Sequence, residues 1–319
     1  MSDRKAKIKE EITAAYRWIL GRDADQPGLE DYCVKIETGV LDFSDLRRSL
    51  LDSEEFNQST SRALAIADIW DGMKIVIDPS DPEFGRHIVA DGGWEPHIAA
   101  AIKAQLEPGH TFVDIGANVG VMSFPAAAKV GPLGKVIAFE PNLANASSFK
   151  RGLVANQLDN IRLFTFGLSD AAHMISLTNA SNAKVTGEAS ALQDLEVVQA
   201  IPGDEILLSQ ERVDLIKIDV EGFEYRVLQG LSGTIAKFAP RILCEFNPLC
   251  LEAQGRIDPA LLADHLFTLA PHGDLVEQDG SLTRVCSSAE LMVMWARRDA
   301  DLTSKGSLPP GWLHFDILL

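Results

Sequence analysis

The sequence contains little cysteine, few basic residues and no long apolar run. Its four cysteines in 319 residues lack CxxC spacing, which argues against a disulfide framework and a structural zinc site and favours the reducing cytoplasm. No segment reaches the ~18 apolar residues of a membrane helix, and the charged N-terminus does not resemble a signal peptide. With 29 Lys+Arg against 46 Asp+Glu, the net charge of −17 predicts no nucleic-acid partner and no attraction to anionic membranes.

What the chain does contain is typical of a folded enzyme or binding domain. Hydrophobic residues make up 46% and charged residues 24%, which excludes intrinsic disorder. The patterning predicts a small all-helical domain at residues 1–60 and a connector with short strands at 61–92. A larger α/β domain is expected at 93–300, followed by a C-terminal tail at 301–319.

Apolar segments of strand length alternate with helical patterns in the larger domain. This alternation predicts a mostly parallel sheet with helices on both faces. The expected strands are 111–115, 136–140, 161–166, 215–219, 241–245 and a late strand at 291–296.

A glycine loop follows the first of these strands and opens a helix. It contains Asp114, Gly116, Ala117, Asn118 and Gly120 in place of the GxGxxG run of a dinucleotide site. A carboxylate at Asp114 would repel a pyrophosphate, and it suits a ligand with a cationic amine. The alternative is that Asp114 only caps the turn.

The second strand ends in Glu140 and Pro141. An acid at this place accepts hydrogen bonds from both ribose hydroxyls of a bound nucleotide. Together with the loop, it predicts binding of S-adenosylmethionine, unless Glu140 is merely an exposed strand end.

Four segments carry a family resemblance: 113–120 (VDIGANVG), 138–142 (AFEPN), 215–224 (LIKIDVEGFE) and 242–248 (ILCEFNP). They resemble the FkbM family of S-adenosylmethionine-dependent methyltransferases. The resemblance implies a Rossmann-like class I fold with a seven-stranded sheet ordered 3-2-1-4-5-7-6, the seventh strand antiparallel. It also implies O-methylation of a hydroxyl on a sugar of a surface polysaccharide or glycolipid, or on a related natural product.

Residues 14–56 resemble a small helical domain of unknown function through the segment YRWILGRDAD, which starts at Tyr16. That module accompanies glycan-modifying and secreted bacterial proteins. The resemblance implies partners among glycan-assembly enzymes or a second copy of the chain. The alternative is a plain packing module.

The reaction needs a base to remove the proton of the acceptor hydroxyl. Asp219 is the first candidate because it ends the fourth strand, beside the expected sulfonium. Glu221 is the second candidate, unless it only stabilises a turn or the N-terminus of a helix. His87 is the third candidate. We expect Glu224 in a first helical turn, facing solvent.

Further cofactor contacts are expected before the first strand and after the third. Glu95, in a segment that resembles the lid of the family, is expected at the methionine end of the cofactor. Leu168 and Ser169 are expected to form the adenine wall, or else an ordinary turn.

A metal site is the next hypothesis. Asp219 and Glu245 end adjacent strands, with Asn247 two residues further on. Such oxygen ligands suit Mg²⁺, as at similar strand ends of catechol-type O-methyltransferases. The alternative is that Asp219 acts as a base without a metal.

Two other functions compete with methyl transfer. One is a non-catalytic glycan- or partner-binding protein that retains the methyltransferase fold. The other is an NAD-dependent oxidoreductase, against which the sequence of the glycine loop argues.

Overall fold

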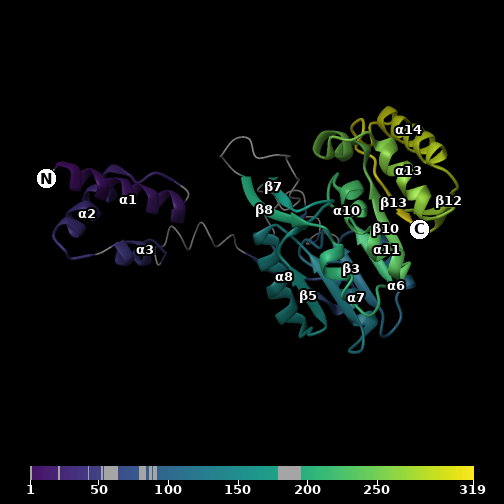
Figure 1. The fold of residues 1–319 in the computed structure, drawn as a ribbon, viewed down its shortest axis with the longest axis horizontal. Helices are drawn as coiled ribbons and strands as arrows, with labels where there is room; N and C mark the ends of the chain where they lie inside the picture. Colours follow the sequence, from purple (N-terminus) through teal and green to yellow (C-terminus); the bar gives the residue numbers. More distant parts are fainter. Residues whose placement is uncertain are drawn as a thin grey trace. The chain divides into compact units, whose positions relative to one another are not determined.

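The computed structural model describes residues 2–20, 22–41, 43–51, 53, 64–78, 84–85, 88, 92–178 and 195–319. The chain forms two compact units, Met1–Leu64 and Ala65–Leu319 (Figure 1). The boundary falls inside the segment expected as a connector, so the short strands of that segment belong to the second unit. Among the described residues, no helix combines the length and the apolar character that crossing a membrane requires.

The first unit contains helices α1 (Ser2–Leu20), α2 (Gln26–Glu37) and α3 (Phe43–Leu51). Buried side chains from all three meet in one core, including Ile12, Cys33 and Leu46. The carboxylate of Asp25 caps α2 by accepting a hydrogen bond from the N–H of Gly28 at 2.8 Å. The expected N-terminal helices are therefore present.

The second unit is built on an eight-stranded mixed sheet ordered β12-β11-β13-β10-β9-β3-β4-β5. Its strands are β3 (Thr111–Ile115), β4 (Lys135–Phe139), β5 (Ile161–Phe164), β9 (Leu215–Ile218), β10 (Arg241–Phe246), β11 (Gly273–Val276), β12 (Leu282–Val285) and β13 (Phe315–Leu318). The five strands from β5 to β10 run parallel, whereas β13 is antiparallel to both of its neighbours. Seven strands thus follow the expected order, and β12 is an additional edge strand.

Helices cover both faces of this sheet: α6 (Pro96–Gln105), α7 (Ser123–Val130), α8 (Leu143–Asn156), α10 (Glu224–Gly230), α11 (Ser232–Phe238), α13 (Pro259–Leu269) and α14 (Ser288–Ser304). The side chains of successive residues of β3 pack on opposite faces of the sheet. Phe112 packs with α6, α7 and α8, and Val113 packs with α10 and α13. A strand buried on both faces is apolar throughout, which explains why the parallel strands were recognisable in the sequence.

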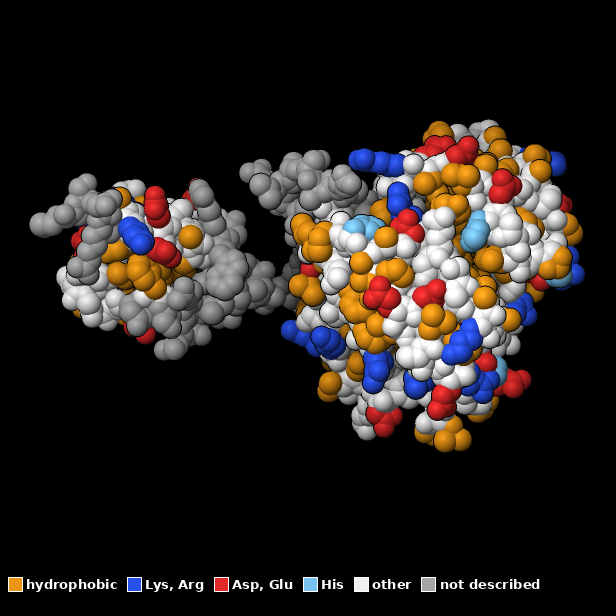
Figure 2. Space-filling model, viewed as in Figure 1, with side chains coloured by type: hydrophobic (Ala, Val, Ile, Leu, Met, Phe, Trp, Pro, Cys, Tyr) orange, Lys and Arg blue, Asp and Glu red, His pale blue; other side chains and the backbone are white. Residues whose placement is uncertain are grey.

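Smaller elements surround the sheet: β1 (Ala65–Asp68), the 3₁₀ turn η1 (Trp70–Gly72), β2 (Lys74–Ile77), β6 (Gly167–Leu168), β7 (His173–Thr178), β8 (Leu195–Ile201), α9 (Asp204–Leu207), α12 (Pro248–Cys250) and the π-helical turn η2 (Leu251–Gly255). Strands β6, β8 and β7 form a separate three-stranded sheet. On the face shown in Figure 2, Lys and Arg side chains are interspersed with Asp and Glu side chains. Neither sign of charge dominates this face.

The expected late strand at 291–296 is wrong. These residues lie in α14, where Leu291 is buried and Val293 is 69% exposed. Ser287 caps this helix by accepting from the N–H of Glu290, a start signal that outweighs the apolar run. The last strand is instead β13, formed by the segment expected as a tail, and it lies between β10 and β11.

Candidate active site

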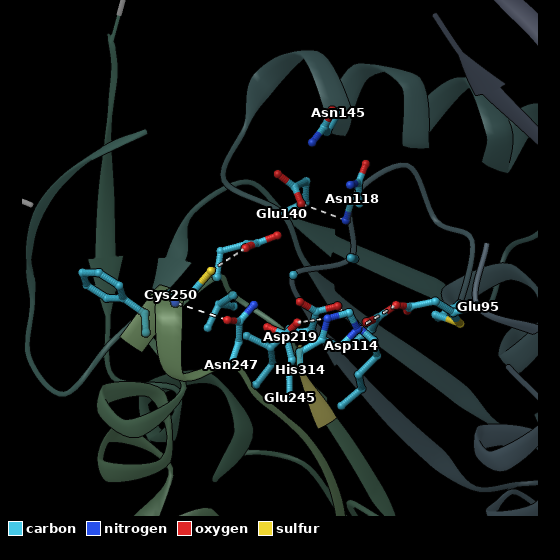
Figure 3. A pocket seen from close by; sticks show the side chains of 18 of the residues that line it. Glu95, Asp114, Asn118, Glu140, Asn145, Asp219, Glu245, Asn247, Cys250 and His314 are labelled. Carbon is cyan, nitrogen blue, oxygen red and sulfur yellow. Dashed lines mark hydrogen bonds and ion pairs between the residues drawn. The ribbon is translucent and has the colours of Figure 1, made fainter. Parts of the chain in front are cut away.

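A cavity of about 460 Å³ lies at the carboxyl ends of the central parallel strands (Figure 3). Parallel strands bring their carboxyl ends to one edge, which is where open α/β sheets bind ligands. Most of the residues expected from the sequence line it: Glu95, Asp114, Gly116, Ala117, Asn118, Glu140, Pro141, Leu168, Asp219, Glu221, Glu245 and Asn247.

Two expected site residues that the structure describes, Ser169 and Gly120, are not among those that line the cavity. The hydroxyl of Ser169 donates to Asp170, and its N–H donates to the carbonyl of Ile201. Gly120 has a φ of 98°, and a Cβ there would lie 2.5 Å from the ring of Phe124, so it serves the turn. His87 lies outside the described residues.

Gly116 brings the glycine loop close to the end of β9. Its φ is 84°, and a Cβ there would lie 1.7 Å from the carbonyl oxygen of Asp219. The N–H groups of Gly116 and Ala117 both donate to the carbonyl of Phe139 at 3.0 Å. Only glycine fits this approach, which brings the ends of β3, β4 and β9 together.

Glu140 is buried and held by backbone donors. One carboxylate oxygen accepts from the N–H of Asn118 and the other from the N–H of Asn142, each at 2.8 Å. Burial raises the pKa of Glu140 to about 7, although these N–H groups act in the opposite direction. A side-chain hydrogen bond from Asn145 also lowers this pKa. Glu140 lines the cavity, where its carboxylate can accept from a ligand hydroxyl.

Asp114 is also buried, and one of its oxygens is unpartnered. Oδ2 accepts from the hydroxyl of Ser123 at 2.6 Å, whereas Oδ1 has no hydrogen-bond partner within the described structure. Burial raises the pKa of Asp114, and the charge of Lys217 opposes this rise. A buried acceptor without a partner costs free energy, so this site fits a ligand that donates a hydrogen bond there.

Asp219 is held by a lysine that we did not predict. Lys217 Nζ lies 2.9 Å from Asp219 Oδ2, and this lysine side chain is 5% exposed. Burial alone would lower the pKa of Lys217, but the charges of Asp219 and Asp114 outweigh it and raise this pKa. A lysine inside an apolar strand, two residues before an acid on the same face, was the available signal.

The turn after β9 shapes the next part of the site. Glu221 adopts a left-handed conformation with a φ of 54°, and its carboxylate accepts from the thiol of Cys250 at 3.2 Å. Glu224 does not face solvent as expected, because its carboxylate is fully buried and accepts from the N–H groups of Val220 and Gly222. Burial raises the pKa of Glu224 to about 7.

A second group of charged side chains lies beside Asp219, and the sequence analysis missed two of its members, His314 and Asp316. His314 Nε2 lies 3.7 Å from Glu95 Oε1, and its Nδ1 lies 4.0 Å from Glu245 Oε1. Pairing with Glu95 raises the pKa of His314 to about 9, against the effect of burial. Burial raises the pKa of Asp316 to about 7 and that of Glu245 well above its usual range.

The expected magnesium ligands have other partners in this structure. Asp219 is paired with Lys217, and the side-chain oxygen of Asn247 accepts from the N–H of Cys250 at 3.2 Å, which caps α12. Only Glu245 retains a buried oxygen, Oε2, with no partner among the described residues. In this structure, Asp219 and Asn247 are thus held by Lys217 and by the backbone of Cys250.

The remaining walls are apolar and aromatic. Ile175 and Leu177 of β7 line one side, and Phe223 and Trp312 line another. Residues 195–201 form β8, and residues 179–194 lie outside the described residues.

Residues 114–272 match the methyltransferase FkbM domain family. The chain is 28% identical over 164 residues to methyltransferase sdnD of Sordaria araneosa, covering 40% of this chain and 62% of that protein. It is 26% identical over 176 residues to hexuronic acid methyltransferase AglP of Haloferax volcanii, covering 54% of this chain and 67% of that protein.

Among solved structures, the chain is similar to methyltransferase FkbM from Methylobacillus flagellatus KT, with a TM-score of 0.40 and 14% identity. That likeness covers 85% of this chain and 57% of the other. The chain thus spans less than two thirds of the length of this protein and of sdnD.

Proposed function

We propose that this chain, which carries an FkbM-family methyltransferase domain over residues 114–272, is an S-adenosylmethionine-dependent O-methyltransferase acting on a sugar hydroxyl. The acceptor would belong to a surface polysaccharide, a glycolipid or a related natural product. One observation carries the proposal: the carboxylates of Asp114, Glu140 and Asp219 meet in one cavity at the ends of three adjacent parallel strands.

The cofactor-binding half would use Asp114 and Glu140. The unpartnered oxygen of Asp114 would accept from the ammonium group of the methionine moiety. The two oxygens of Glu140, held from behind by backbone N–H groups, would accept from the ribose hydroxyls. Leu168 and the turn at Pro141 would enclose the adenine, and Glu95 would face the methionine end.

Asp219 would act as the general base. When bound, S-adenosylmethionine supplies a methyl group that passes to the acceptor oxygen as the carbon–sulfur bond breaks. Asp219 would take the proton that leaves the acceptor hydroxyl. The ion pair with Lys217 orients the carboxylate, because Lys217 Nζ donates to Asp219 Oδ2 at 2.9 Å.

The acceptor half fits a carbohydrate. Phe223 and Trp312 offer aromatic faces to the C–H groups of a sugar ring, and Trp312 is 59% exposed at the cavity mouth. Carboxylates such as Glu221 and Glu245 can accept from sugar hydroxyls. The similarity to a protein named as a hexuronic acid methyltransferase supports this class of acceptor.

Calorimetric titration tests the cofactor assignment directly. S-adenosylmethionine and S-adenosylhomocysteine are expected to bind and NAD is not, because Asp114 would repel a pyrophosphate. Binding of NAD alone would favour an oxidoreductase.

Transfer of a labelled methyl group to a glycan extract then separates an enzyme from a binding protein. The wild-type chain is expected to label the glycan and Asp219→Asn to leave it unlabelled. Binding of the cofactor without any transfer would favour the non-catalytic alternative.

A further inference from the structure

One cluster of side chains, of which Glu95 and His314 line the cavity, neither gives nor takes the methyl group or the proton in the proposed reaction. Among the described residues, Glu95, His314 and Asp316 form the one group of His, Cys, Asp and Glu side chains whose ligand atoms suit a metal ion. One nitrogen or oxygen of each lies within 4.8 Å of the others. Ligand atoms around one divalent ion lie up to about 4 Å apart, so small side-chain rotations would close the set.

The backbone explains why these side chains converge. Asp316 of β13 is the register partner of Glu245 of β10, so the two side chains leave the sheet on the same face. His314 precedes Asp316 by two residues and points to the same side. Glu95 reaches the group from the N-terminus of α6, where it adopts a left-handed φ of 49°.

Glu245 provides an independent sign of a missing ligand. This residue is 8% exposed, and its Oε2 is buried without a hydrogen-bond partner within the described structure. Its Oε1 lies 4.0 Å from His314 Nδ1, so the carboxylate faces the same cluster (Figure 3). A buried carboxylate oxygen without a donor is costly unless a cation or a donor occupies the space beside it.

The local charge points in the same direction. Glu95 and Glu245 line the cavity here, and Asp316 is the register partner of Glu245 on the neighbouring strand, so three carboxyl groups lie near His314. A divalent cation bound among them would bring positive charge to these carboxyl groups.

We propose that Glu95, His314 and Asp316, with Glu245 as a fourth ligand, bind a first-row divalent cation such as Mn²⁺. Three carboxylates and one imidazole form a mixed oxygen and nitrogen donor set. Such a set suits Mn²⁺ or Zn²⁺, whereas Ca²⁺ prefers ligands that are all oxygen. Of the magnesium ligands expected from the sequence, this set retains only Glu245.

The role of the cation rests on the proposed function. Bound beside Asp219, it would accept the oxygen of the acceptor hydroxyl as a ligand, lower the pKa of that hydroxyl and leave the proton to Asp219. The site itself is tested without any acceptor or cofactor.

The experiment is a titration of the full chain with Mn²⁺. The electron paramagnetic resonance signal measures how much Mn²⁺ remains free at each step. One bound ion per chain is expected, and Zn²⁺ should displace it. His314→Gln and Asp316→Asn are each expected to weaken binding at least tenfold (about 1.4 kcal/mol). Asp219→Asn is the matched control, a neighbouring carboxylate outside the set that should change the affinity less than threefold. Circular dichroism checks that each variant is folded.

Three results would overturn the proposal. They are no saturable binding of Mn²⁺ or Zn²⁺ to the wild type, unchanged binding in a folded His314→Gln, or loss of binding in Asp219→Asn but not in His314→Gln. The last result would instead favour the metal site expected from the sequence, with Asp219, Glu245 and Asn247 as its ligands. A parallel titration with S-adenosylmethionine reports on the proposed function separately, so failure of one remains distinguishable from failure of the other.

Discussion

The cofactor half and the acceptor half of the cavity hold their carboxylates in different ways. Glu140 accepts from backbone N–H groups of its own loop and of the adjacent glycine loop. Glu245, in contrast, faces His314 and Asp316, which arrive on a strand about seventy residues later in the chain. Backbone donors prepare an acid for a neutral hydroxyl, whereas a group of side-chain acids with few donors favours a cation.

The largest effect is expected where the two halves meet. Asp219→Asn is nearly isosteric but removes the base, so turnover should fall by at least about 10²-fold. The affinity for S-adenosylmethionine should change less than tenfold, or about 1.4 kcal/mol. Single-turnover kinetics and calorimetry measure the two quantities. Glu221→Gln is the matched control, and loss of turnover there with retention in Asp219→Asn would transfer the role of base to Glu221.

Gly116→Ala tests how rigidly the cofactor half is built. The added Cβ would lie 1.7 Å from the carbonyl oxygen of Asp219, and the φ of 84° is unfavourable for alanine. We expect a loss of about 3 kcal/mol or more in the free energy of unfolding, measured by urea denaturation. Gly109→Ala is the control, because Gly109 has a φ of 86° and nothing within 4 Å of an added Cβ. There only backbone strain remains, about 1–2 kcal/mol; equal losses at the two positions would show that the close approach is unimportant.

Glu140→Gln tests the acid of the cofactor half by pH. Because the pKa of Glu140 is about 7, its carboxyl is charged above that pH and increasingly protonated below it. The affinity of the wild type for S-adenosylmethionine should therefore fall from about pH 8 to about pH 6, while the variant binds about tenfold more weakly (about 1.4 kcal/mol) at the higher pH.

The same variant gives a check on stability. A folded-state pKa above the ordinary 4.5 means that the contribution of Glu140 to the free energy of unfolding is fully present below pH 4.5 and is lost as the pH rises through 7. Glu140→Gln should remove this share of the pH dependence. A variant with the same pH profile of affinity and stability as the wild type would place the titrating group elsewhere.

The smallest effect is expected from removal of the N-terminal unit, Met1–Leu64, whose described residues contribute no strand to the large sheet. The affinity of residues 65–319 for S-adenosylmethionine should remain within about twofold of that of the full chain, about 0.4 kcal/mol. A folded truncated protein that cannot bind the cofactor would contradict this. If the N-terminal helices bind a glycan-assembly enzyme or a second copy of the chain, analytical ultracentrifugation of the two forms should differ.

The arrangement of Asp114 and Glu140 at neighbouring strand ends was largely predictable, because its signals are local. The strand at 111–115, the glycine loop and the acid at the end of the next strand lie within one βαβ unit, where chain order imposes spatial order. Ser169 and Gly120 show the limit of this reasoning, because both stand in the expected motifs and neither is among the described residues that line the cavity.

By itself, the sequence determined the parallel strands, the glycine loop after the first of them and the acids at the strand ends. Each depends on hydrophobic periodicity or on the conformational freedom of one residue. Only the tertiary structure decided that β13 enters the sheet beside β10, which brings His314 and Asp316 to Glu245, and that Glu224 is buried. Pairing between distant strands depends on register and on burial of whole faces, and no local pattern specifies which distant segment will occupy the open edge.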